Sequence, residues 1–311
     1  MKADLMQKSS LGKRLKDDMR RNASLYLLVL PVLAFYIIFC YKPMYGAIIA
    51  FKRYSPGAGI WGSPWVGFQN FIELFQSADF ARIFKNTVVI SLANIVVGFP
   101  APIILALLIN EMKIGPFRKI TQTVSYMPHF ISLVVICALI RNFVGNGGFI
   151  QQIVKFFGGP DGSMLNRSEY FVPIHVLSGI WQEVGWGSII YIAALSGIDQ
   201  QMYEAAQIDG AGKWKQMLCV TLPGLKPTII IMLILRLGSV LSVGYEKIIL
   251  LYNPLIYETS DVISTYVYRT GFESQDWSYS TAVGLFNSVI NFVILIIANS
   301  LSKKFGETSL F

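Results

Sequence analysis

The chain has 311 residues, of which 54% are hydrophobic and only 14% are charged, and its mean hydropathy is +0.53. Soluble domains usually carry about 25% charged residues, so this composition excludes an ordinary soluble domain and indicates an integral membrane protein. The formal net charge of +8 would also suit a nucleic-acid binder, but the distribution of the charges along the chain argues against nucleic acid as a partner.

The chain opens with a charged tail, 1–23, in which Leu11, Leu15 and Met19 recur at helical spacing among lysines and arginines. This pattern fits a short amphipathic helix in contact with lipid at the inner membrane surface, and it fits a solvated charged tail equally well. The first apolar run follows without a small-residue cleavage site. It therefore predicts an uncleaved membrane anchor rather than a signal peptide.

Six apolar segments approach or exceed the length of about 20 residues that a helix needs to cross a bilayer. The fourth contains Glu183 and the fifth contains Arg236. The sequence thus predicts an all-α integral membrane protein with a six-span domain at 24–302 and a short tail at 303–311. The predicted spans are 24–41, 87–109, 124–140, 172–195, 228–245 and 282–301.

An even number of spans places both termini on one side of the membrane. Fifteen lysines and arginines and eight acidic residues lie on that side, against ten of each on the other. Because positive charge accumulates on the cytoplasmic side, we expect both termini to be cytoplasmic. The first outer loop, which holds five basic residues, fits this orientation least well.

Between the fourth and fifth predicted spans lies a polar loop, 198–227, which the charge count places in the cytoplasm. Asp199 can cap a helix over 200–208, and Gly210 then supplies a position where a positive φ is free of steric cost. A second short helix, 213–220, is expected to end at two prolines that lead into the fifth span. Such a pair of helices would form a rigid protrusion from the membrane.

This loop resembles the "EAA" loop of the membrane permeases of binding-protein-dependent ABC importers, which reads Glu-Ala-Ala, three residues, Gly, then Leu-Pro some ten residues later. In that family the first helix of the loop docks on an ATP-hydrolysing subunit. The resemblance therefore implies a coupling role for this loop, in which Glu204 offers a carboxylate to the ATPase. The matching positions are Glu204, Ala205, Ala206, Asp209, Gly210, Ala211, Leu222 and Pro223.

The resemblance extends over the rest of the chain. The stretches YLLVLPVLAFYIIFCYKPMYGAIIAFKRYSP, WVGFQNF and FKNTVVIS are similar to the start of six-span permeases for carbohydrate uptake, of the polysaccharide-permease type. The resemblance implies four kinds of partner: a second permease in a heterodimer, two ATP-binding subunits, an extracellular solute-binding protein and a carbohydrate substrate. It also implies a multi-pass protein of the cell membrane.

No catalytic constellation is found. The glycine-rich stretches at 145–148 and 158–162 lack the Lys-Ser/Thr that a phosphate-binding loop requires, so we expect turns there and ATP hydrolysis by a partner. The three cysteines are isolated, and with only two histidines the chain predicts no disulfide framework, no metal site and no cofactor.

Charged residues inside spans are candidates for the translocation path, because burying them in lipid is costly. Trp181, Gln182, Glu183 and Trp186 combine aromatic faces with polar groups, as sugar sites do. The alternatives are a cluster at the membrane interface or a Glu183 paired with a neighbouring helix. Arg236 either lines the cavity or forms a structural ion pair, for example with a carboxylate of the second permease.

The function that the sequence favours is therefore the permease subunit of an ATP-driven carbohydrate importer, forming half of the path. An ion-coupled secondary transporter, with Glu183 and Arg236 as coupling groups, is the alternative from another class. A structural membrane scaffold is a third. Neither of these needs a rigid cytoplasmic loop at 198–227, which is why the importer is preferred.

Overall fold

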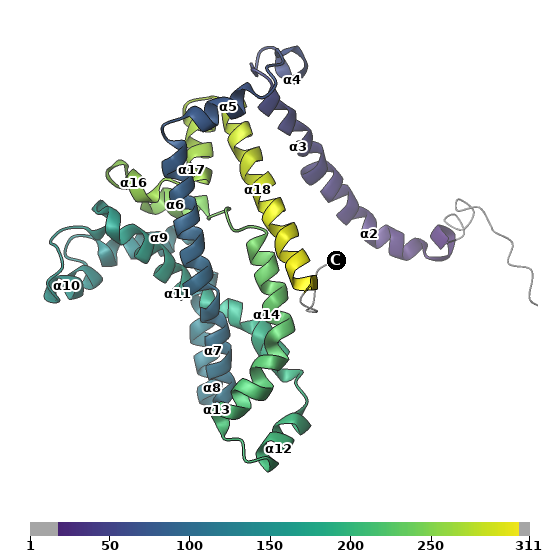
Figure 1. The fold of residues 1–311 in the computed structure, drawn as a ribbon, viewed down its shortest axis with the longest axis vertical. Helices are drawn as coiled ribbons and strands as arrows, with labels where there is room; N and C mark the ends of the chain where they lie inside the picture. The colour runs from purple at the N-terminus through teal and green to yellow at the C-terminus, as the bar shows by residue number, and fades with distance from the viewer. Residues whose placement is uncertain (1–17, 305–311) are drawn as a thin grey trace, which may run out of the picture.

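The computed structural model describes residues 18–304, and within them the chain is almost entirely helical, with one isolated β-bridge between Lys52 and Trp65. Most long helices run lengthwise between two ends of the molecule (Figure 1). The predicted amphipathic helix of the N-terminal tail lies largely outside the described residues. The elements used below are α2 (Ala23–Phe35), η1 (Tyr36–Tyr41), α3 (Lys42–Met44), η2 (Tyr45–Phe51), α4 (Gly59–Gly62), α5 (Gln69–Gln76), α6 (Phe80–Ala93), η3 (Asn94–Gly98), α7 (Pro100–Glu111), α8 (Pro116–Tyr126), η4 (Met127–Phe130), α9 (Leu133–Val144), α10 (Phe149–Phe156), η5 (Met164–Asn166), α11 (Ser168–Ser196), α12 (Gln200–Ile208), α13 (Lys213–Gln216), η6 (Met217–Thr221), α14 (Leu222–Leu237), α15 (Tyr245–Leu251), η7 (Pro254–Ile256), α16 (Tyr257–Ser260), α17 (Ile263–Tyr268), η8 (Arg269–Glu273) and α18 (Trp277–Lys304).

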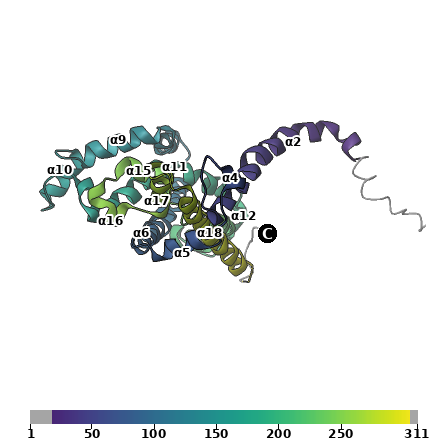
Figure 2. The ribbon, with the colours of Figure 1, turned by 90° about the horizontal axis from the view of Figure 1, so that it is seen from above.

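The first helix stands apart from the rest of the molecule. It continues through α2, η1, α3 and η2, so it ends at Phe51 rather than at the predicted position 41. None of its residues in α2, η1 or α3 is buried, and its contact with the other elements is made at its end, where η2 packs on α18. Figures 1 and 2 both show α2 leading away from the other helices. Its exposed apolar side chains are therefore suited to contact lipid or another subunit.

The second long helix contains a local irregularity with a clear cause. The elements α6, η3 and α7 form one continuous rod, and the predicted span at 87–109 lies inside it. Its middle, η3, is π-helical. Pro100 and Pro102 follow and have no backbone N–H to continue the regular i to i−4 ladder, so the winding changes just before them.

The predicted third span at 124–140 is wrong as a single helix. The α8 helix ends at Tyr126, a 3-10 turn follows, and α9 begins at Leu133 with Ser132 as its N-cap. Pro128 lies within this break. The membrane-span candidate of this region instead covers Leu133–Phe156. The absence of charge over this stretch predicted an apolar segment correctly but gave no sign of the break.

The predicted fourth span lies within α11, which has 29 residues. Among the described residues, five helices are long and apolar enough to cross a membrane, and α11 is not one of them, since its polar residues lower its hydropathy. The count of six spans therefore remains a prediction at this helix. The five candidates are Ala23–Phe51, Phe80–Glu111, Leu133–Phe156, Lys213–Leu237 and Trp277–Lys304.

The prolines after the polar loop do not end a helix. From Lys213 to Leu237 the chain is one helix of 25 residues, with a π-helical segment, η6, immediately before Pro223. Pro227 lies inside α14. Both prolines lie near the start of a long helix whose π-helical segment accommodates the missing N–H group, so the predicted boundary there was wrong.

The predicted fifth span at 228–245 also breaks, at 238–244, between α14 and α15. Exposed polar backbone is costly in a membrane, so this turn needs partners. Ser91 Oγ of α6 donates a hydrogen bond to the Val240 carbonyl at 2.5 Å. The Leu241 N–H donates to Asn291 Oδ1 of α18 at 2.9 Å. Two neighbouring helices thus hold the non-helical turn in place.

Candidate functional site

The first part of the loop between α11 and α14, up to Gly210, has the local structure that its sequence predicts. The Asp199 carboxylate accepts a hydrogen bond from the Gln201 N–H at 2.9 Å, and α12 spans the expected residues. At the other end Gly210 has φ +76°, a conformation open to glycine at no cost. The Gly210 N–H donates to the Gln207 carbonyl and the Ala211 N–H to the Ala206 carbonyl, so a Schellman motif closes the helix.

Two contacts within this loop and one contact to α7 hold it in place. Tyr203 shares a hydrogen bond with Thr221 at 3.1 Å, which ties α12 to the residue before α14. Gln216 Nε2 donates to the Ala211 carbonyl at 2.7 Å. Lys213 and Glu111 at the end of α7 form an exposed ion pair at 3.4 Å, which adds little stability by itself. The loop is therefore a rigid extension of the bundle rather than a tether.

Most of the surface of α12 is accessible, since none of its residues is buried. Glu204, Ala205 and Asp209 are exposed, and Ala206 is half-buried. Leu222 and Pro223 lie in the first turn of α14. The structure also shows two large exposed apolar side chains that the sequence analysis did not single out: Ile208 is 87% exposed and Trp214 is 77% exposed. Large apolar side chains this exposed at the tip of a protrusion suit a protein partner.

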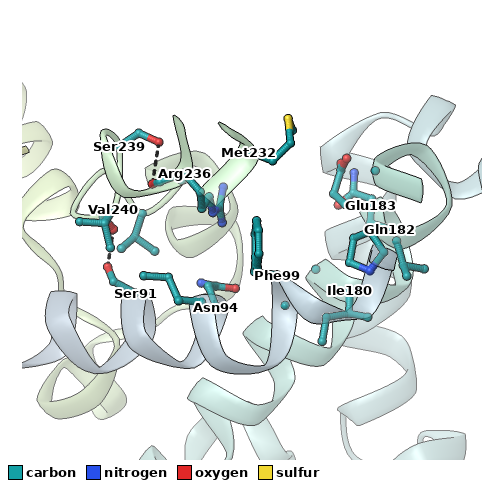
Figure 3. A pocket seen from close by; sticks show the side chains of 18 of the residues that line it. Ser91, Asn94, Phe99, Ile180, Gln182, Glu183, Met232, Arg236, Ser239 and Val240 are labelled. Carbon is teal, nitrogen blue, oxygen red and sulfur yellow. Dashed lines mark hydrogen bonds between the residues drawn. The ribbon is translucent and has the colours of Figure 1, made fainter. Parts of the chain in front are cut away.

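Away from this loop, residues of α6, η3, α7, α11, α14, α15 and the turn between α14 and α15 line an open cavity of about 560 Å³ (Figure 3). This volume is in the size range of small-molecule sites. Gln182, Glu183, Trp186 and Arg236 all line it, so the structure brings together four of the five residues predicted for the path. Trp181 lies elsewhere, in a smaller apolar groove with Pro128 and Val184.

Glu183 sits near the middle of α11 and is paired with a neighbouring element. Its Oε2 lies 2.9 Å from Nδ1 of His129 in η4. Trp186, one turn further along α11, stacks on the His129 ring with centroids 4.5 Å apart and planes 1° from parallel. The alternative of a paired glutamate is thus observed, and the pair fixes the break between α8 and α9 against α11.

Arg236 is on the opposite side of the cavity from Glu183 (Figure 3). It is exposed, and among the described residues no carboxylate lies within ion-pair distance of its guanidinium. Within residues 18–304 it therefore lines the cavity without an ion-pair partner.

The sequence did not predict four residues as part of this site. Asn94, His175 and Lys247 line the cavity, and His129 contacts Glu183 in its wall. Lys247 was counted in an outer segment because it follows the predicted fifth span. The break at 238–244 instead returns it to the cavity wall. A histidine beside a proline inside an uncharged stretch, as at His129, was a usable signal, because polar residues in spans are rarely incidental.

Comparison with known proteins agrees with this architecture. Residues 98–307 match the family described as "Binding-protein-dependent transport system inner membrane component". The polygalacturonan/rhamnogalacturonan transport system permease protein YteP of Bacillus subtilis (strain 168) is 43% identical over 307 residues, covering 98% of this chain and 95% of YteP. Protein LplB of the same organism is 42% identical over 294 residues, covering 94% of this chain and 92% of LplB.

Two crystal structures share the fold along nearly the whole chain. One is a bacterial ABC transporter involved in the import of the acidic polysaccharide alginate, with a TM-score of 0.87 and 43% identity over 94% of this chain and 100% of that one. The other is a bacterial alginate ABC transporter in complex with an alginate pentasaccharide-bound periplasmic protein, with a TM-score of 0.87 and 42% identity over 96% and 100% of the two chains. The chain therefore belongs to the family of inner-membrane components of binding-protein-dependent transport systems: it is a multi-pass permease subunit and not the ATP-hydrolysing one.

Proposed function

We propose that this chain forms half of the translocation path of an ATP-driven importer for a sugar or oligosaccharide delivered by an extracellular binding protein. The relatives described above carry names that refer to polygalacturonan, rhamnogalacturonan and alginate, all carbohydrates. The cavity supports the same substrate class, since Trp186 and Phe99 offer aromatic faces beside the polar side chains of Gln182 and Asn94. Family membership leaves no reason to retain the ion-coupled alternative.

A second permease subunit is the first partner in this proposal. Glu183 has 54% of its side chain exposed in the isolated chain, and Arg236 is also exposed. Yet Glu183 lies in α11, within the predicted fourth span, and Arg236 lies in α14, within the predicted fifth span. Charged side chains facing lipid are costly, so another protein surface or a water-filled path must cover them. A similar permease facing this cavity would supply the protein surface and would enclose a water-filled path between the two subunits. The unpartnered first helix offers a further apolar surface to such a subunit.

The ATPase is the second partner, and α12 is its proposed docking site. The observation that carries this proposal is a short, doubly capped helix that has no buried residue and is tied through Tyr203 and Thr221 to the base of α14. Movement of α12 would pass to α14, which carries Arg236 in the cavity wall. Glu204 would accept a charge-assisted hydrogen bond from the ATPase, next to the small side chains of Ala205 and Ala206.

This role of Glu204 predicts a coupling defect in the Glu204→Ala variant. Charge-assisted hydrogen bonds contribute about 1.5–3 kcal/mol, so ATP hydrolysis stimulated by the loaded binding protein should fall roughly tenfold or more, and uptake should fall with it. The amount of protein and its membrane insertion should be unchanged, because Glu204 has no partner among the described residues. The measurement is hydrolysis and uptake by the importer in proteoliposomes. Gln201→Ala, on the same exposed helix, is the matched control, and parental coupling in Glu204→Ala would remove Glu204 from the mechanism.

The proposal also requires α12 and both termini to be cytoplasmic, as the charge count predicts. We expect a cysteine introduced at Lys213, in a background without the three native cysteines, to react with a membrane-impermeant thiol reagent in inverted vesicles and not in intact cells. Lys213 is exposed beside α12, so access is not limited by packing. A cysteine at Trp61, which is 80% exposed near the α4 end, should show the opposite pattern. Labelling of position 213 in intact cells would contradict both the orientation and the ATPase docking site.

A further inference from the structure

Lys247 is an unusual feature of the cavity wall. It is only 8% exposed, and its Nζ donates a hydrogen bond to the His175 carbonyl of α11 at 3.0 Å. No carboxylate among the described residues forms an ion pair with it. A buried ammonium without a counter-ion is costly, and such residues are retained where they act on a ligand or an ion.

The fold makes room for this lysine. A Cβ placed on Gly179 of α11 would lie 3.3 Å from Lys247 Nζ, which is tight contact, so the absence of a side chain at Gly179 allows the ammonium to lie against the helix. The turn at 238–244, held by Ser91 and Asn291, fixes the start of α15 and with it Lys247. Three separate helices, α6, α11 and α18, therefore support the position of one charge.

Arg236 adds a second positive charge to the same cavity. It has no ion-pair partner among the described residues, whereas the one anionic side chain in the lining, Glu183, is already held by His129 at 2.9 Å. Figure 3 shows Arg236 on the far side of the cavity from Glu183. The lining thus has a formal charge of +1, and its two cations are the charged groups that have no ion-pair partner among the described residues.

Neutral groups in the wall complete the pattern. The His175 Nδ1 atom is buried without a hydrogen-bond partner, and the Asn94 side chain has no partner in the described part of the chain. Both residues line the cavity, together with the rings of Phe99 and Trp186. Buried polar atoms are normally satisfied, so the unpartnered His175 Nδ1 is unusual. The half-buried Asn94 amide lies beside aromatic faces and can hydrogen-bond a ligand that carries hydroxyl groups.

From these observations we infer that the cavity selects sugars that carry a carboxylate, that is, uronate residues, with Arg236 and Lys247 as the specificity-determining pair. This inference rests on the proposed carbohydrate path and names its substrate class. A guanidinium binds a carboxylate through two parallel hydrogen bonds, and an ammonium adds a point charge. A phosphate ester carries about two negative charges at neutral pH, which fits a lining of +1 less well than a monoanion does.

The first test measures the charge of the cavity without any sugar. In the assembled importer without native cysteines, Ser239→Cys should react faster with an anionic methanethiosulfonate reagent than with a cationic one, relative to free cysteine. Arg236→Gln or Lys247→Gln should each lower the ratio of the two rates by about tenfold, as expected for one unit charge at close range. A cysteine at Gln201 on α12 is the control and should keep its ratio. An absence of anion preference at Ser239→Cys, for instance because the second permease supplies carboxylates, would overturn the inference.

The second test uses trigalacturonate and its methyl ester, which differ only in the charge of the carboxyl groups. Uptake of both probes by the complete importer in proteoliposomes gives an acid-to-ester ratio. Because the binding protein is the same throughout, a change of this ratio between permease variants belongs to the permease. We expect Arg236→Gln and Lys247→Gln to lower the ratio at least tenfold while uptake of the ester persists, and Arg236→Lys to recover part of it. Lys155→Gln, which removes an exposed charge paired with Asp161 outside the cavity, should leave the ratio unchanged.

The outcomes separate the two levels of the argument. If the parental importer moves neither probe nor any other oligosaccharide, the proposed carbohydrate function fails. If it moves them and the variants leave the ratio unchanged, or reduce both uptakes equally while the importer still assembles, the carboxylate inference fails and the carbohydrate function stands. Should Lys247→Gln not assemble, the exposed Arg236→Gln decides the question alone.

Discussion

The Gly185→Val variant should fail to accumulate as a folded permease. A Cβ at position 185 of α11 would lie 1.9 Å from the Ser125 carbonyl oxygen of α8 and 2.3 Å from its carbonyl carbon. Both atoms are main-chain atoms, so no change of side-chain rotamer can relieve the clash. Overpacking in a core costs about 1–3 kcal/mol when side chains can move, and we expect a larger loss here because two helices must separate.

Separation of α8 from α11 would also move η4, and with it His129, away from Glu183. The measurement is the yield of monodisperse protein in detergent and its apparent melting temperature. Gly284→Val is the matched control, since it places the same side chain on α18 where a Cβ meets nothing within 4 Å. Equal yields and melting temperatures for the two variants would show that α8 and α11 do not pack as closely as described.

Features that depend on neighbouring residues could be predicted from the sequence. The bounds of α12, its Asp199 cap and the positive φ of Gly210 follow from side chains within a few positions of each other. The long apolar helices also followed from composition. The errors concern where helices break or continue. In the turn after Leu237, the distant residues Ser91 and Asn291 satisfy the backbone. The break after Tyr126 is held to α11 by the contact between His129 and Glu183.

In the cavity, too, locally visible features could be predicted from the sequence and features that depend on the tertiary structure could not. Glu183 and Arg236 were predicted because a charge inside an apolar run is conspicuous. Lys247 was missed because its place in the wall depends on the break at 238–244, and Asn94 because amides in membrane helices more often hold helices together. Which charges lie across from each other, and which are already paired, are tertiary facts that no local pattern contains.

The second large effect is expected from Asp261→Ala. Asp261 is completely buried. Its carboxylate accepts hydrogen bonds from Arg269 Nη1 at 3.1 Å and from Arg269 Nη2 at 2.6 Å. It also accepts hydrogen bonds from Thr265 Oγ1 at 2.9 Å and from Arg82 Nη2 at 3.5 Å. Burial lowers the pKa of the Arg269 guanidinium, but its hydrogen bonds and charge attraction to Asp261 outweigh this and raise the pKa overall. Removing the carboxylate would leave a cation largely desolvated and unpaired. A loss of about 3–5 kcal/mol in stability is therefore expected.

The loss of this network should also alter the cavity, because Asp261 holds α17 through its hydrogen bond to Thr265. Ser264 of α17 donates a hydrogen bond at 3.0 Å to the carbonyl of Val243, a residue of the cavity wall close to Lys247. Asp261→Ala should thus lower the apparent melting temperature and also reduce the acid-to-ester uptake ratio of any protein that assembles. Asp261→Asn, which keeps the shape and the bond to Thr265, should lose less stability. Arg269→Gln added to Asp261→Ala should recover part of the loss, since it removes the unpaired cation. Parental stability in Asp261→Ala, or a further full loss on adding Arg269→Gln, would show that the two residues do not act as a buried pair.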